Sequence, residues 1–189
     1  MRSKSDMKSA SSQFNINGWG EGYFEVTEDG RMAVRPRPGA PAIEIAEIAA
    51  EARERKLQFP LLIRFQDLLR HRVRVLNEAF GQAIGEYGYP QPYRGVFPIK
   101  VNQLREVVEE IMDEGRAYHF GIEAGSKPEL LAVLAIHDDP ESLLLCNGFK
   151  DGSFIRHALA GRKLGKQVVI VIEKLEEYFN AMKIANELQ

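Results

Sequence analysis

The feature that most constrains the fold is a repeat of short apolar runs, each followed by an amphipathic segment, through the second half of the chain. The strand-like runs are residues 95–99, 117–122, 143–146 and 167–172. The first polar residue near the end of each run is, in order, Lys100, Glu123, Asn147 and Glu173. These ends lie 23, 24 and 26 residues apart. Short strands alternating with helices at so steady a spacing predict parallel βα units.

Two α/β architectures are built from such units. A closed TIM-type (β/α)8 barrel takes about 250 residues, whereas this chain has 189 and carries four units after residue 92. No Gly or Pro follows the last apolar turn before Gln189. We therefore expect the first half of an interrupted, truncated barrel. An open doubly wound sheet is the competing architecture.

The first half of the chain has a different organisation. Residues 1–16 are polar and predict a disordered tail. Residues 17–41 predict a β-hairpin, because two β-prone runs flank an Asp-Gly pair. Residues 42–92 predict a helix, a strand over 59–65 and a second helix leading into the partial barrel of residues 93–189.

Composition excludes several classes of protein. The net charge of −2 gives no general attraction to nucleic acid. No apolar run approaches the roughly 20 residues that span a membrane, and no apolar segment follows the basic N-terminus, so we expect a cytoplasmic protein. The single Cys146 rules out an internal disulfide and is expected to be a buried strand residue. The four histidines have no second ligand at metal spacing, so no protein-built metal site is predicted.

The strand ends carry the residues with chemical potential. In a parallel barrel the carboxyl ends of the strands form the reactive face. Lys100 follows a buried-looking run there, so we expect it to be partly desolvated, which would free its amine to form a Schiff base. Glu123, one strand along, either orients this lysine or is a surface carboxylate near a helix N-terminus.

Three further polar residues are weaker candidates for lining a pocket. These are Asn102, Ser126 and Asn147. Ser126 also suits a capping box, as the N-cap of a helix with Glu129 reaching back to it. Asn147 equally suits a turn, because Gly148 follows it.

Several of these runs resemble the biosynthetic arginine decarboxylases, in the family's order and spacing. The run that resembles its cofactor-lysine motif is Val96-Phe97-Pro98-Ile99-Lys100-Val101-Asn102-Gln103. The family's next strand and helix start are matched by Gly121-Ile122-Glu123-Ala124-Gly125-Ser126-Lys127-Pro128-Glu129-Leu130. Its third strand is matched by Leu145-Cys146-Asn147-Gly148-Phe149-Lys150-Asp151. Residues 20–24 and 169–174 also match, so the resemblance runs from about Trp19 to the end.

The resemblance implies a pyridoxal phosphate-binding barrel of the alanine-racemase-like class, in a homo-oligomeric lyase that acts on L-arginine. It implies that Lys100 is the catalytic residue and carries the cofactor covalently, with Glu123, Asn102, Ser126 and Asn147 as further cofactor-binding candidates. The product would be agmatine, with carbon dioxide, in putrescine and spermidine biosynthesis. The family is also associated with magnesium.

Parts of the family pattern cannot be located in this sequence. They are a stacking histidine, a glycine-rich phosphate-binding loop, an acid for the pyridine nitrogen and a second domain. Because phosphate contacts supply much of the binding of such a cofactor, we expect this chain alone to be inactive.

Three alternatives stay open. The substrate could be another basic amino acid, namely ornithine, lysine or diaminopimelate. The protein could be a non-catalytic homologue with a regulatory binding role. It could also be a doubly wound domain unrelated to pyridoxal phosphate.

Overall fold

The computed structural model describes residues 10–188 of the chain. It divides into two compact units, Met1–His71 and Arg72–Gln189. Helix α4, Gln66–Tyr87, contains the boundary between them. Among residues 10–188, no helix has the length and apolar character needed to cross a membrane.

Unit 1 is built on a small antiparallel sheet. Its elements are α2 (Ile16–Trp19), β1 (Phe24–Val26), β2 (Met32–Val34), β3 (Ile43–Glu44) and α3 (Ile45–Glu54). The predicted hairpin is confirmed, because β1 pairs antiparallel with β2. Its turn uses Gly30 at a φ of 78°, the left-handed region that glycine adopts without strain. β3 then pairs with β2, which the sequence did not predict.

Two expectations for unit 1 differ from the structure. The predicted tail of residues 1–16 lies outside the described residues up to residue 9, but residues 10–13 are helical and Ile16 is 3% exposed. The strand predicted over residues 59–65 is wrong, because this stretch is irregular. Leu62 is 75% exposed and Leu61 and Ile63 are only partly buried, and the run pairs with no strand of the described residues.

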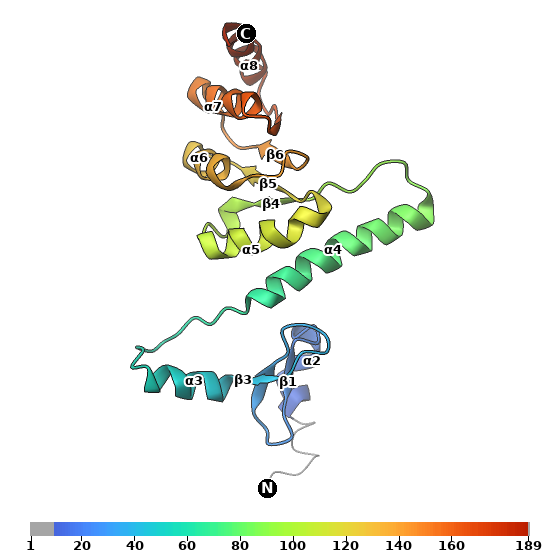
Figure 1. Ribbon diagram of the computed structural model, residues 1–189, viewed down its shortest axis with the longest axis vertical. Coiled ribbons are helices and arrows are strands. Elements are labelled where there is room, and N and C mark those ends of the chain that lie inside the picture. The colour runs from blue at the N-terminus through green and yellow to red at the C-terminus, as the bar shows by residue number, and fades with distance from the viewer. Residues whose placement is uncertain (1–9, 189) are drawn as a thin grey trace. The chain divides into compact units, whose positions relative to one another are not determined.

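Unit 2 is a parallel sheet with helices between its strands. The strands are β4 (Val96–Pro98), β5 (Gly121–Ala124), β6 (Leu143–Cys146) and β7 (Gln167–Ile170). The helices are α5 (Arg105–Gly115), α6 (Lys127–Ile136), α7 (Gly152–Lys163) and α8 (Leu175–Glu187). The strands lie in the order β4-β5-β6-β7, so each pairs with its neighbour in sequence (Figure 1). A doubly wound sheet reverses its strand order at a switch point, so this sheet has the order of a barrel.

The two faces of the sheet in unit 2 differ, because successive side chains of a strand point to opposite faces. Ile122 and Leu144 are paired in register and fully buried in the core. Phe154 of α7 and Leu130 of α6 pack into the same core. Glu123 lies between Ile122 and Ala124 and therefore points away from these helices, to the face that would be the inside of a barrel.

The strand β5 begins later than predicted. Residues 117–122 were expected to be a strand, but Arg116–Tyr118 form a 3-10 turn, and His119 follows with a φ of 51°. The strand starts at Gly121, where a Cβ would lie 2.2 Å from the carbonyl oxygen of Leu143. The close approach of β6 therefore requires glycine at this position.

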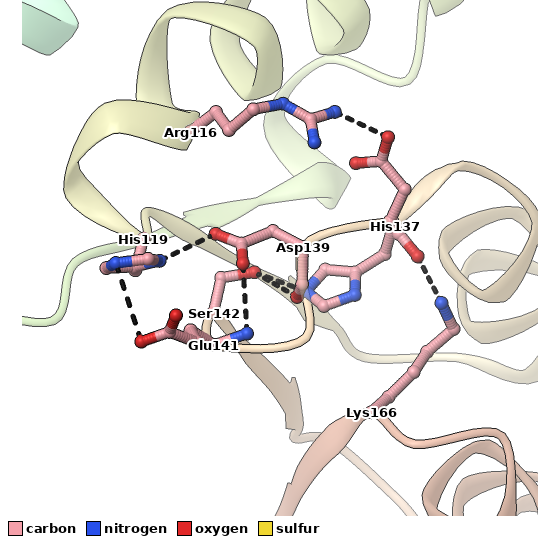
Figure 2. A network of polar contacts seen from close by, with 8 residues as sticks. Arg116, His119, His137, Asp139, Glu141, Ser142 and Lys166 are labelled. Atoms are coloured by element: carbon pink, nitrogen blue, oxygen red, sulfur yellow. Dashed lines mark hydrogen bonds and ion pairs between the residues drawn. The ribbon is translucent and has the colours of Figure 1, made fainter.

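A polar cluster occupies the amino ends of the strands, and we call it the amino-end network (Figure 2). Its members are Arg116, His119, His137, Asp138, Asp139, Glu141, Ser142 and Lys166. The Nδ1 atom of His119 lies 3.0 Å from Oδ2 of Asp139, and the Ser142 hydroxyl lies 2.7 Å from Nε2 of His137. Lys166 donates to the carbonyl of His137. The network joins the segments that precede β5, β6 and β7.

Candidate functional site

A cleft of about 340 Å³ lies at the carboxyl ends of the strands of unit 2, and we call it the carboxyl-end cleft. It is lined by Lys100, Glu123, Gly125, Ser126, Glu129, Asn147, Gly148 and Glu173. These residues follow or end all four strands β4 to β7. The sheet thus brings together residues that are up to 73 positions apart in sequence, from Lys100 to Glu173. This is the arrangement expected of a barrel's reactive face.

Lys100 occupies a 3-10 turn, Ile99–Val101, directly after β4. Ile99 is 3% exposed and anchors this turn in the core. The Nζ atom of Lys100 lies 3.7 Å from Oε1 of Glu123. The expected desolvation of Lys100 is wrong for this chain, because its side chain is 61% exposed. The turn carries Lys100 out of the buried strand and over the open cleft.

Glu123 is the side chain that faces this lysine. It is 14% exposed, and its Oε1 atom lies 3.5 Å from Nδ2 of Asn147, at the long limit for a hydrogen bond. Asn147 follows β6, so the amide and the carboxylate belong to neighbouring strands. Since Glu123 lies within β5, its direction is fixed by the pleat and does not depend on a mobile loop.

Ser126 and Glu129 line the cleft beside β5. The Ser126 hydroxyl accepts a hydrogen bond from the backbone N–H of Glu129, at 3.4 Å, as the predicted N-cap of α6. The predicted return contact differs, because the Glu129 carboxylate accepts from the N–H of Gly125, at 2.8 Å, and not from Ser126. Gln103 donates to the same carboxylate at 2.9 Å. Glu129 therefore ties the loop after β4 to the loop after β5.

Asn102 is the one predicted site residue that does not line the cleft. Its Oδ1 atom accepts a hydrogen bond from the N–H of Leu104, at 3.1 Å, in the turn that precedes α5. This is an ordinary turn contact for asparagine. The structure brings Lys100, Glu123, Ser126 and Asn147 together, while Asn102 shapes the adjoining turn.

Four lining residues were not predicted to be site residues: Gly125, Glu129, Gly148 and Glu173. Glu173 had a signal in the sequence, because it follows the fourth apolar run. Gly148 has a φ of 70°, and a Cβ there would lie 2.4 Å from the carbonyl oxygen of Gly125. The loops after β5 and β6 therefore approach each other too closely for any side chain at this position.

Neither a reactive thiol nor a metal-binding cluster accompanies the cleft in residues 10–188. Cys146 points into the core, and burial raises the pKa of its thiol to about 12, which leaves it unreactive at neutral pH. No group of three or more His, Cys, Asp or Glu side chains is placed to hold a metal ion within residues 10–188.

Proteins of known family are similar to this chain in sequence and in fold. Residues 71–187 match the family model described as pyridoxal-dependent decarboxylase, pyridoxal binding domain. The chain is 46% identical over 176 residues to the biosynthetic arginine decarboxylase of Prochlorococcus marinus (strain MIT 9303), covering 93% of this chain and 27% of that protein. It is 43% identical over 175 residues to the same-named protein of Bacteroides thetaiotaomicron, covering 93% of this chain and 28% of that one.

A solved structure has the same fold. The crystal structure of the biosynthetic arginine decarboxylase SpeA from Campylobacter jejuni matches with a TM-score of 0.84 and 32% sequence identity, over 92% of this chain and 29% of that one. The chain thus spans little more than a quarter of the length of the relatives it matches. The small antiparallel sheet followed by the parallel sheet corresponds to the N-terminal part of their pyridoxal phosphate-binding barrel. The chain belongs to the pyridoxal-dependent decarboxylases and carries part of their pyridoxal-binding domain.

Proposed function

We propose that this chain supplies the lysine-bearing part of the active site of an arginine decarboxylase, which converts L-arginine to agmatine and carbon dioxide. The observation that carries the proposal is the position of Lys100, whose amine stands over the carboxyl-end cleft 3.7 Å from Glu123. The relatives named biosynthetic arginine decarboxylase support arginine as the substrate.

The residues of the cleft fit one end of the cofactor and not the other. Lys100 offers a primary amine that is accessible to an aldehyde, as covalent attachment of pyridoxal phosphate requires. The lining does not suit the phosphate, because it carries one lysine and the three carboxylates of Glu123, Glu129 and Glu173. Carboxylates repel a phosphate. The cofactor would therefore be held here by its aldehyde end, and its phosphate needs residues outside this cleft.

The bound cofactor would supply an electron sink that allows carbon dioxide to leave the α-carbon of the amino acid. The chain's own residues would do the holding. Lys100 would fix the cofactor covalently through Nζ and release it when the substrate amine takes its place. Glu123 would hold the Nζ atom of Lys100 on the side of β5, and the Asn147 amide would restrain one oxygen of that carboxylate.

The lysine assignment is tested by chemical trapping. The 189-residue chain is incubated with pyridoxal phosphate, reduced with borohydride and mapped by peptide mass spectrometry. We expect selective labelling of Lys100 over Lys127, a half-exposed lysine paired with Asp151. A Lys100→Ala variant should show only background labelling. Equal labelling of Lys127 and Lys100 would contradict the assignment.

The activity is tested separately, since we propose that this chain alone is inactive. Carbon dioxide release from carboxyl-labelled arginine should be absent with the isolated chain, and robust release would overturn that part of the proposal. A chimera should then be made in which this chain replaces the matching segment of the Prochlorococcus marinus enzyme. We expect it to decarboxylate arginine in preference to ornithine, lysine or diaminopimelate, and to lose activity with Lys100→Ala.

Several finer parts of the proposal rest on resemblance to the family. They are a magnesium requirement, a homo-oligomeric assembly, a cytoplasmic location and a role in the synthesis of putrescine and spermidine. The chimera gives access to the first two, through assay with a chelator and through its mass in solution.

A further inference from the structure

Lys150 is a buried lysine beside the carboxyl-end cleft that the proposed reaction does not use. It lies in the loop between β6 and α7, and its side chain is 0% exposed. A lysine is almost never fully buried unless its charge is paired. Its Nζ atom lies 3.4 Å from Oε2 of Glu177, whose side chain is 4% exposed, and 3.9 Å from Oε1 of Glu173. The same Nζ atom donates a hydrogen bond to the carbonyl of Gly148.

Glu177, in α8, contacts both the loop after β6 and the loop after β7. Its carboxylate accepts from the backbone N–H of Lys150, at 3.2 Å, and from the N–H of Glu173, at 3.0 Å. Burial alone would raise the pKa of Glu177, but these N–H groups and the charge of Lys150 outweigh burial and lower that pKa. The carboxylate is therefore charged at neutral pH and neutralises Lys150 within the protein.

The pair acts on residues that line the cleft. Gly148 and Glu173 both line it, and each is held by Lys150 or Glu177. Gly148 is also the residue whose backbone passes within contact distance of Gly125 on the neighbouring loop. A shift of Gly148 would move Asn147, which is adjacent to it and restrains Glu123 opposite Lys100. Contacts thus connect Lys150 to the amine of Lys100 through Gly148, Asn147 and Glu123.

We infer that Lys150 is a positioning residue, which with Glu177 locks the loops after β6 and β7 and so sets the geometry in which Lys100 receives the cofactor. This inference rests on the proposed function of Lys100. It assigns Lys150 no contact with the cofactor, because its charge is buried against Glu177 and its amine is bonded to Gly148. It distinguishes the buried lysine from Lys100, whose amine is exposed.

The test compares two lysines that each donate to a backbone carbonyl at opposite ends of the sheet. Lys150→Met removes the contact with Gly148, and Lys166→Met, in the amino-end network, removes the matched contact with His137. Both variants are studied below their unfolding transitions, so that the folded fraction is the same. We expect borohydride-trapped labelling of Lys100 to slow by about tenfold in Lys150→Met, as expected for a misplaced reacting group. Labelling in Lys166→Met should match the parent chain.

Removing one partner of a buried ion pair destabilises a protein strongly. Two further variants therefore separate the loss of stability from the loss of positioning. Lys150→Met combined with Glu177→Gln removes both charges and should recover much of the stability without recovering the labelling rate. Glu177→Asp keeps the charge but shortens the side chain, and it should slow labelling less than Lys150→Met does. Labelling at the parent rate in the double variant, or in Glu177→Asp where the double variant does not fold, would overturn the positioning role.

Amide hydrogen exchange provides a readout that does not depend on the cofactor. In Lys150→Met, residues 147–152 should exchange faster while the core strand β5 keeps its protection. Unchanged exchange over residues 147–152 would overturn the inference even if Lys100 is never labelled. Failure of the parent chain to label Lys100 would count against the proposed function alone.

Discussion

The two ends of the parallel sheet in unit 2 are both polar, but they are built differently. At the amino ends, charged and polar side chains meet at short distances, such as 2.7 Å between Ser142 and His137. At the carboxyl ends, Glu123 lies 3.7 Å from Lys100 and 3.5 Å from Asn147, beside an open cleft. Both ends contain close hydrogen bonds, such as that from the N–H of Gly125 to Glu129, at 2.8 Å, at the carboxyl end. Only the cleft, however, also presents the 61% exposed side chain of Lys100. The difference is that the carboxyl end leaves an amine accessible to a ligand.

Glycine at the two ends gives the sharpest test of this comparison. Gly148, at the carboxyl end, and Gly165, between α7 and β7, both have positive φ values, of 70° and 86°. A Cβ at Gly148 meets Gly125 at 2.4 Å, while a Cβ at Gly165 meets no atom within 4 Å. We expect Gly165→Ala to cost about 1 to 2 kcal/mol of unfolding free energy, and Gly148→Ala to cost more than about 3 kcal/mol.

Stability is measured by chemical denaturation, and labelling of Lys100 is measured separately on the folded protein. Gly148→Ala should also slow the labelling, because the loops that line the cleft must separate. Equal losses of stability in the two variants would mean that the close approach of the loops after β5 and β6 is unimportant.

Ser142→Ala tests the amino end. The Ser142 hydroxyl lies 3.1 Å from the carbonyl oxygen of Asp139 and 2.7 Å from Nε2 of His137, within hydrogen-bond distance of both. The variant leaves the buried Nε2 atom of His137 without its hydrogen-bond partner, at an expected cost of about 1 to 3 kcal/mol. Labelling of Lys100 should be unchanged. Ser153→Ala, at an exposed position of α7, is the matched control and should be nearly neutral. Slower labelling in Ser142→Ala would show that the two ends are coupled.

The pH dependence of stability should reveal His137. Burial, and then the charge of Lys166, lower the pKa of this imidazole, and its Nδ1 atom has no hydrogen-bond partner. The folded protein therefore prefers neutral His137. Its contribution to stability is complete above the unfolded pKa of about 6.5 and is lost as the pH falls below that value.

The free energy of unfolding should therefore decline between about pH 7.5 and pH 5, before paired carboxylates begin to protonate near pH 4. A His137→Gln variant cannot titrate, so its decline over this range should be shallower. Parallel curves for the two proteins would exclude His137 as the source.

Glu123→Gln should have the smallest effect on stability. Its partner Lys100 is 61% exposed and 3.7 Å away, so the loss should be below about 0.5 kcal/mol. Labelling of Lys100 should slow by roughly twofold to threefold, the equivalent of a weak pair of this kind. Asp138→Asn, at the amino end, removes a carboxylate paired with Arg116 and serves as the control. An identical effect of the two substitutions on labelling would remove Glu123 from the site.

Much of unit 2 was predictable from the sequence, because its strands and helices have strong periodic patterns. Strand β6 has the predicted bounds, residues 143–146. Lys100, Glu123, Ser126 and Asn147 were predicted to lie together because each stands at or just after a strand end, and all four line the cleft. Unit 1 was harder, since its strands are two or three residues long and β3 forms only where β2 offers an edge. The run of residues 59–65 had strand composition but no partner.

The sequence by itself determined the order of elements, the βα spacing and the lysine that follows β4, because these depend on local patterns along the chain. Only the tertiary structure decided that Lys100 is exposed, that Asn102 serves a turn and that Lys150 is buried against Glu177. Position after a strand does not predict which lysine is exposed, since Lys100 and Lys150 each follow a strand. Their environments differ because the turn after β4 opens onto the cleft, while the N-terminus of α8 brings a carboxylate to Lys150. The charge of a lysine is set by its residue type, but its accessibility depends on which distant segments the fold places around it.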